Sequence, residues 1–252
     1  MAAQLTTNNQ YHTLYIQISI RSTRPPEPGT MLVSIEGIDG CGKGTQTARI
    51  IDRARASGAR AATLTFPRYG ETHFSESISA YLNGDYGDLQ SVPARFAALL
   101  YAGDRLESRD ELESLIAGHD LVVLDRYVAS NLAYQAARVP PDERAALTQW
   151  IARVEFDVYH LPKPDLQILL DVPADVARGL VDRKGRRTYT TKKADLHEAD
   201  VTYLAAVREV YHALARHDEQ GAWRTVACTD EEGAMLSVEQ ITDTIWSIID
   251  AA

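Results

Sequence analysis

Short apolar runs alternate with longer stretches of helical periodicity along most of this chain. The runs are rich in Val, Ile and Leu and are bounded by turn residues, which is typical of buried strands. We expect strands at 32–36, 62–66, 121–125, 166–171 and 223–227. Apolar residues at helical spacing predict helices over 44–58, 73–82, 91–117, 128–138, 141–159, 174–183, 196–218 and 237–250.

This alternation predicts an α/β fold, with a parallel sheet that helices cover on both faces. A chain of 252 residues is long enough for one large domain of this class. Residues 1–30 contain turn and linker sequence such as TTNNQ and RPPEPGT, so we expect a poorly ordered N-terminal extension before a domain at 31–252. A true start at Met31 is the alternative to a targeting role, because the extension has few arginines and no secretory apolar segment.

Composition narrows the class of partner. A chain with 45% apolar and 24% charged residues is neither disordered nor fibrous. Its net charge of −9 argues against general nucleic-acid binding, but it permits a small anionic ligand in a local basic pocket. No apolar run approaches the ~20 residues of a spanning helix, so we expect no membrane partner. The 2 cysteines cannot form a disulfide framework, which favours a cytoplasmic location.

Residues 37–45, GIDGCGKGT, follow the first expected strand and match the GxxxxGK pattern of a phosphate-binding loop. Glycines let successive backbone N–H groups surround a phosphate, and the following helix directs its positive end at the same point. We therefore expect a nucleoside triphosphate here, with the Lys43 ammonium on its β and γ phosphates. The residues assigned to this nucleotide, which the resemblance described below identifies as ATP, are Gly37, Gly40, Cys41, Gly42, Lys43, Gly44 and Thr45.

The sequence is compatible with two sets of ligands for Mg²⁺. Gly44 stands where a Ser or Thr hydroxyl usually binds Mg²⁺, so either phosphates, water and a carboxylate hold the ion or Thr45 takes part. Asp125 ends an expected strand, where open α/β sheets place ligands, and could hold hydrated Mg²⁺ through water. A strand-end cap is the alternative. Arg126 beside it is a fork suited to phosphate.

A set of motifs in this order resembles the thymidylate kinase family: EGIDG at 36–40, FPRY at 66–69, DRYVASN at 125–131 and LPKPD at 161–165. The resemblance covers residues 31–250. It implies ATP-dependent phosphorylation of dTMP to dTDP, for dTTP synthesis, and a homodimer. The implied fold is a P-loop NTPase-type, doubly wound, five-stranded parallel sheet of order 2-3-1-4-5 with a mobile lid.

The resemblance also implies roles for residues around dTMP. Arg126 binds the dTMP phosphate and guides the transferred group, and Asp39 contacts the acceptor's 3′-hydroxyl and the metal region. Asn131 meets the base edge, and Tyr134, one turn later, crowds the 2′ position of the sugar. A carboxylate beside phosphates is electrostatically costly, so a purely structural role for Asp39 is not expected.

Two further segments are assigned to the base. Phe66 and Pro67 would form an apolar wall for thymine while Arg68 reaches toward phosphate, although a core-to-loop transition explains this sequence equally well. Tyr101 and Arg105 are four residues apart and share a helix face. By resemblance Tyr101 stacks on thymine and Arg105 hydrogen-bonds it; the alternative is a core aromatic with an exposed arginine.

Residues 183–193, RKGRRTYTTKK, are strongly basic within an acidic chain. Such a run is usually solvated surface, but this one lies where nucleoside monophosphate kinases carry a lid, expected here at about 183–195. Arg183, Arg186 and Arg187 are then the candidates for stabilising the transferring phosphoryl group.

Two rivals stay open at this point. GKGTQ at 42–46 also resembles adenylate kinase, which would make the protein another nucleoside monophosphate kinase. Gly44, and His197 in the segment DLHE at 195–198, motivate a nucleotide-binding protein without turnover.

Overall fold

The computed structural model describes residues 29–88, 91–183, 201–216 and 221–252, with the backbone alone at 181–183. The expected N-terminal extension and lid therefore lie outside the described residues, apart from 29, 30 and the backbone of Arg183. Within the described part no helix is long and apolar enough to cross a membrane.

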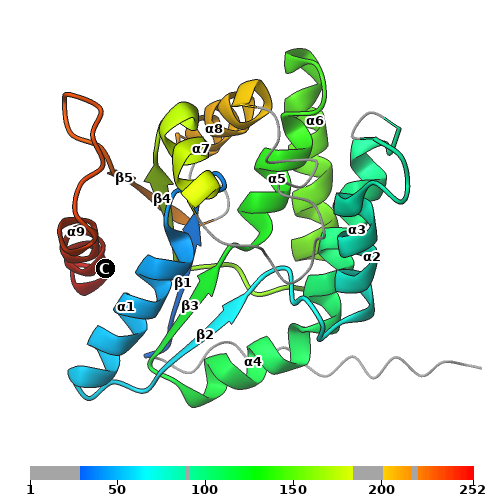
Figure 1. The fold of residues 1–252 in the computed structure, drawn as a ribbon. Coiled ribbons are helices and arrows are strands. Elements are labelled where there is room, and N and C mark those ends of the chain that lie inside the picture. Colours follow the sequence, from blue (N-terminus) through cyan, green and yellow to red (C-terminus); the bar gives the residue numbers. More distant parts are fainter. Residues whose placement is uncertain (1–28, 89–90, 184–200, 217–220) are drawn as a thin grey trace, which may run out of the picture.

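A five-stranded parallel sheet of order β2-β3-β1-β4-β5 forms the centre of the molecule (Figure 1). The expected fold class and strand order are confirmed. β1 is the middle strand, and its Ile35 is in register with Asp125 of β3 and Ile168 of β4. The strands are β1 Met31–Glu36, β2 Ala61–Thr65, β3 Leu121–Asp125, β4 Leu166–Asp171 and β5 Ala222–Ala227.

The helices largely follow the expected pattern. Of the helix expected over 196–218, residues 196–200 and 217–218 lie outside the described residues. The helical elements are α1 Lys43–Ala56, α2 His73–Asn83, α3 Ala94–Glu107, α4 Arg109–Gly118, α5 Val128–Ala136, α6 Pro141–Ala152, the π-helix η1 Arg153–Val158, α7 Ala174–Arg183, α8 Val201–Ala215 and α9 Val238–Asp250.

The expectation of one helix over 91–117 is wrong. The helix is interrupted at Ser108, whose hydroxyl donates to the Asp104 carbonyl at 2.9 Å. Such back-bonding by serine bends helices, and here α3 and α4 diverge (Figure 1). The helix expected over 141–159 also changes form, because its last turns widen into η1 and place Glu155 and Phe156 in the interior.

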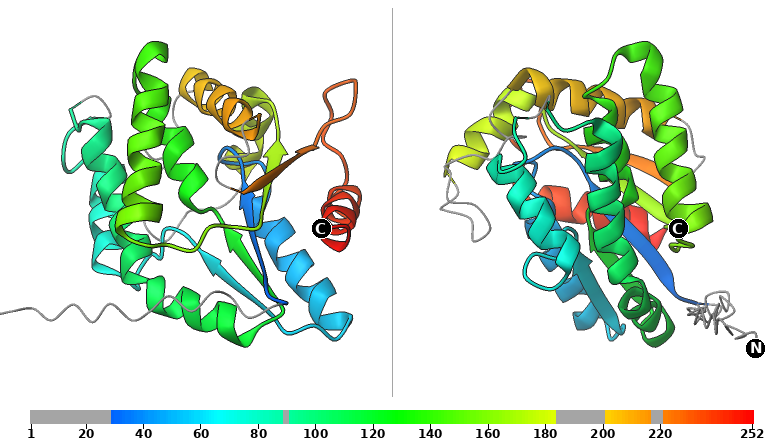
Figure 2. Two further views of the ribbon diagram at one scale, coloured as in Figure 1. Left: turned by 180° about the vertical axis from the view of Figure 1, so that it is seen from behind. Right: turned by 90° about the vertical axis from the view of Figure 1, so that its right-hand side faces the viewer.

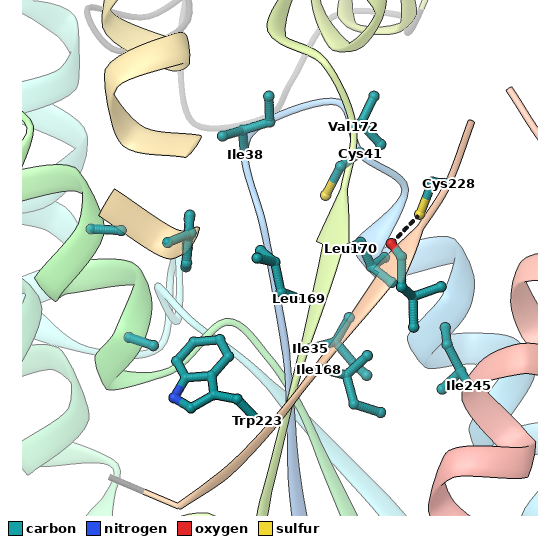
Figure 3. Packing of buried hydrophobic residues seen from close by; sticks show 14 of the residues in the cluster. Ile35, Ile38, Cys41, Ile168, Leu169, Leu170, Val172, Trp223, Cys228 and Ile245 are labelled. Carbon is teal, nitrogen blue, oxygen red and sulfur yellow. Dashed lines mark hydrogen bonds between the residues drawn. The ribbon is translucent and has the colours of Figure 1, made fainter. Parts of the chain in front are cut away.

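Alternate residues of the strands supply two packing surfaces. Val33, Ile35 and Val123 pack with α1 and α9, while Leu32 and Leu124 pack with α4, α5 and α6. Figure 2 shows the sheet enclosed between these groups of helices. Figure 3 shows Ile35 and Ile168 beside Ile245 of α9, with Leu169 and Trp223 on the other side of the strands. The polar residues at the carboxyl ends of β1 and β3 are thus held on a rigid base.

Candidate active site

The phosphate loop curls between β1 and α1. Gly37 and Gly42 have φ values of 141° and 96°, which only glycine adopts readily. A Cβ on Gly37 would lie 2.7 Å from the Leu170 carbonyl oxygen, so space as well as conformation requires glycine there. The buried Lys43 ammonium donates to the carbonyls of Gly37 at 3.1 Å and Ile38 at 2.8 Å. This loop and the start of α1, whose first turn has no acid, form a cradle for an anion.

Gly44, in the first turn of α1, lies next to the Asp125 carboxylate at the end of β3. A Cβ on Gly44 would lie 3.1 Å from Oδ2 of Asp125, so the carboxylate occupies the region beside the position where a hydroxyl is usual. Thr45 is exposed on α1. No group of three or more His, Cys, Asp or Glu within the described residues could hold a metal alone. Asp125 supplies a hard oxygen donor beside the loop, the kind of donor that Mg²⁺ binds, and phosphate oxygens of a nucleotide would have to complete the coordination.

Arg126 links β3 to the phosphate loop. Its Nη2 donates to Asp39 Oδ1 at 2.6 Å and its Nη1 to the Gly37 carbonyl at 3.1 Å. The Tyr134 hydroxyl donates to Asp39 Oδ2 at 2.7 Å, and its ring lies under the guanidinium. Burial lowers the pKa of Arg126, but the surrounding negative groups, Asp39 foremost, together outweigh this and keep the pKa well above the ordinary value. Asp39, Arg126 and Tyr134 are thus brought together, with the arginine charged.

A buried acid supports this arginine from behind. Glu36 Oε2 accepts from Ser130 Oγ at 2.7 Å, and Oε1 accepts from the Tyr127 backbone N–H at 2.8 Å. Ser130 Oγ in turn accepts from Arg126 Nη1 at 3.1 Å. The Tyr211 hydroxyl of α8 lies 2.8 Å from Ser130 Oγ. Burial raises the pKa of the Glu36 carboxyl, although these hydrogen bonds and the Arg126 charge oppose the rise.

Arg126 also has an unusual backbone. Its φ of 67° lies in the left-handed region, which is rare for residues other than glycine. Its N–H donates to the Ile35 carbonyl at 3.0 Å, so the turn after β3 is tied to β1. Strain of this kind clusters at functional sites, where the surrounding structure holds it in place.

The residues expected at the base form a second cluster. Arg105 is 2% exposed, which overturns the alternative of an exposed arginine. It pairs with Glu155 of η1 through Nε–Oε2 at 2.5 Å and Nη2–Oε1 at 2.7 Å. Asn131 Nδ2 donates to the same Oε1 at 2.8 Å. Burial lowers the pKa of Arg105, but Glu155 more than compensates and raises it above the ordinary value.

The remaining base-site candidates lie around α3. Phe66 is buried against Tyr127, with ring centroids 5.8 Å apart, and the Phe66–Pro67 peptide is cis. Tyr101 packs against the small cluster of α2 and α3. The Arg68 guanidinium pairs with Glu111 at 2.8 Å, so a role at phosphate would require exchange of this partner.

The lid candidates Arg186 and Arg187 and the side chain of Arg183 lie outside the described residues, as does His197.

The site residues that the sequence predicts leave out three buried acids, Glu36, Asp104 and Glu155. Buried Asp104 accepts from the Arg68 N–H at 3.1 Å and from Thr72 Oγ1 at 2.5 Å, and thereby holds the 66–72 loop. Glu155 left a signal, because it continues the four-residue spacing of Leu147 and Ile151, both buried. A carboxylate on an apolar stripe requires a buried partner.

Comparisons with known proteins identify the family and the fold. The family described as Thymidylate kinase has a sequence model that matches residues 35–236. The thymidylate kinase of Mycobacterium tuberculosis strain H37Rv is 38% identical over 211 residues, covering 82% of this chain and 96% of that protein. That of Thermomicrobium roseum is 31% identical, covering 86% and 93%. In fold, a thymidylate kinase structure from Candida albicans matches with a TM-score of 0.66 at 22% identity, covering 88% and 92%. The chain belongs to the thymidylate kinase family, and it is a phosphotransferase.

Proposed function

We propose that this protein transfers the γ-phosphoryl group of ATP to dTMP, giving dTDP. The observation that carries the proposal is the meeting of Lys43 in the phosphate loop with Arg126 at the end of β3, tied together through Asp39 and the Gly37 carbonyl. Two cations at one sheet edge can serve a donor phosphate and an acceptor phosphate. Family membership supports the identity of the two nucleotides.

The chemistry needs no covalent intermediate, because a phosphate oxygen of dTMP is already a nucleophile. Catalysis then consists of alignment and charge stabilisation. Lys43 and the loop N–H groups hold the ATP phosphates. Arg126 binds the dTMP phosphate and guides the transferred group, and Asp39 limits the positions that its guanidinium can take.

Mg²⁺ is part of the proposal. Asp125 would hold it through water, with Thr45 as the alternative, and the ion would neutralise charge on the ATP phosphates. The short distance between Gly44 and Asp125 supports Asp125 over Thr45 as the metal ligand, because the Asp125 carboxylate lies beside the residue that follows the loop lysine.

The rest of the assignment follows the family pattern. Tyr134 would crowd the 2′ position while its hydroxyl, whose pKa burial raises well above the ordinary value, stays protonated and bonded to Asp39. Phe66, Pro67, Arg68, Tyr101, Arg105 and Asn131 would surround the base. Arg183, Arg186 and Arg187 would act from a lid at about 183–195, in a domain over 31–252. We further propose a cytoplasmic homodimer.

The direct test measures ADP production with ATP and Mg²⁺ while dTMP, dUMP, AMP, CMP and GMP are offered separately. We expect turnover with dTMP far above that with AMP. Turnover with AMP instead would favour an adenylate kinase-like enzyme. Tight binding of ATP and dTMP without production of ADP would indicate a protein that binds nucleotides but does not turn them over.

A further inference from the structure

Glu155 is an acid with no exposure to solvent, and it lies behind the residues assigned to the base. Its two oxygens accept three hydrogen bonds, two from the Arg105 guanidinium and one from Nδ2 of Asn131. The same Nδ2 also donates to the Ala98 carbonyl of α3 at 3.0 Å. Glu155 and Ala98 therefore hold one half of the Asn131 amide from both sides.

This arrangement determines which way the amide faces. A carboxylate and a backbone carbonyl can only accept hydrogen bonds, so the Asn131 atom that contacts both must be the NH₂ group. A flip of the amide would bring Oδ1 against two acceptor oxygens. The NH₂ group has two hydrogens, and these two partners account for both of them.

The other half of the amide is the acceptor oxygen, Oδ1. Oδ1 of Asn131 is buried and has no hydrogen-bond partner within the described residues. Buried acceptors are nearly always satisfied, so this oxygen is free to accept a hydrogen bond from a donor that a ligand supplies. Among pyrimidine bases, thymine and uracil carry an N3–H donor, whereas cytosine has a bare N3 acceptor at that position.

We infer that Glu155 is a positioning residue for base selection, because it fixes the Asn131 amide with its acceptor toward the ligand and so favours a pyrimidine that carries N3–H. The inference rests on the proposed function, which places the base edge at Asn131. It assigns selectivity to a residue that does not itself touch the base.

A simpler role must be distinguished from this one. Glu155 also neutralises the buried Arg105, and loss of that charge alone would weaken the fold and affect every nucleotide alike. Selection by amide orientation instead changes the relative affinity for two bases. The useful quantity is therefore the ratio of the dissociation constants of dCMP and dTMP, which a uniform loss does not move.

The test compares wild-type protein with Glu155→Gln, measuring both dissociation constants by calorimetry and kcat/KM for each nucleotide with ATP. The glutamine keeps the length but can turn a donor toward Asn131. The flipped amide, which offers NH₂ to the base, then accepts a hydrogen bond from the glutamine and opposes only the Ala98 carbonyl instead of two acceptors. We expect the dCMP-to-dTMP ratio of dissociation constants to fall by about tenfold, the change that one hydrogen bond is worth. Glu143→Gln, which changes an exposed acid on α6, is the matched control and should leave the ratio and kcat/KM unchanged.

Glu155→Asp keeps the test usable if Glu155→Gln does not fold. It retains the charge opposite Arg105 but is one methylene shorter, so it cannot keep both Arg105 and Asn131, and the ratio should fall again. An unchanged ratio in a folded variant, with both affinities reduced equally or not at all, would overturn the inference. Failure of the wild-type protein to bind dTMP would instead overturn the proposed function.

Discussion

The two ends of the proposed dTMP site hold their arginines in opposite ways. At the phosphate end, Arg126 and Asp39 have side chains that are 15% and 18% exposed, so a ligand can compete for them. At the base end, Arg105 and Glu155 are 3% and 0% exposed and are closed off from solvent. We therefore expect the phosphate end to exchange partners during a reaction and the base end to act as a preformed frame. Substitutions should therefore cost activity at one end and stability at the other.

The largest expected effect is on turnover, at the phosphate end. Arg126→Ala removes the fork that meets phosphate, and we expect kcat with dTMP to fall by about a thousandfold, as for other preorganised charge-stabilising groups. Arg126→Lys should recover little of this, because an ammonium cannot make the paired contacts. Steady-state kinetics measure the loss. Both variants should keep a thermal midpoint close to that of the wild type. A collapse of stability with Arg126→Lys would contradict the view that the phosphate end serves activity rather than stability.

At the base end the main loss should be in stability. Arg105→Met leaves the Glu155 carboxylate buried without its cation, which costs about 3–5 kcal/mol of unfolding free energy. Urea unfolding followed by circular dichroism measures this. Arg60→Met, at an exposed pair with Asp120, is the matched control and should change the midpoint little. Equal changes in the two variants would show that the base end is not a closed frame.

The third prediction concerns Glu36, which lies behind Arg126. Burial raises its folded pKa above the ordinary carboxyl value of 4.5. The folded state thus binds this proton more tightly than the unfolded state, and the contribution to stability is present below pH 4.5 and lost as pH rises through the folded pKa. Relative to Glu36→Gln, the wild type should become less stable by about 1.4 kcal/mol for each unit of elevation. Denaturation midpoints from pH 4 to pH 8 test this, and parallel curves would refute it.

The smallest expected effect is at Gly44. A Cβ there meets Asp125 Oδ2 at 3.1 Å, so Gly44→Ser requires the carboxylate to shift by a few tenths of an ångström. Serine favours the helix slightly over glycine, by roughly 0.5 kcal/mol, which offsets part of the crowding. We expect kcat within about threefold of the wild type, equivalent to roughly 0.6 kcal/mol. A loss of a hundredfold would mean that the position of Asp125 is critical.

Local patterns explain why much of the fold was predictable. The three central strands β1, β3 and β4 lie in largely apolar, buried segments, and the parallel order of the sheet follows from the resemblance and from the βαβ alternation. The phosphate loop is nine consecutive residues whose glycines carry the required backbone conformations, so its position could be stated in advance. The helix over 91–117 was mispredicted because Ser108 competes for a backbone carbonyl inside an otherwise periodic segment.

The sequence by itself determined the family, the order of the elements, the phosphate loop and the candidates around it, because each depends on residues close together in the chain. Only the tertiary structure decided which acid holds which candidate. Glu36 contacts Ser130 and Tyr211 across 94 and 175 positions, and Glu155 reaches Arg105 across 50. Periodicity can mark such a carboxylate as buried, as it does for Glu155, but it does not identify the partner, since a buried carboxylate is stabilised by whichever donor the packing brings to it.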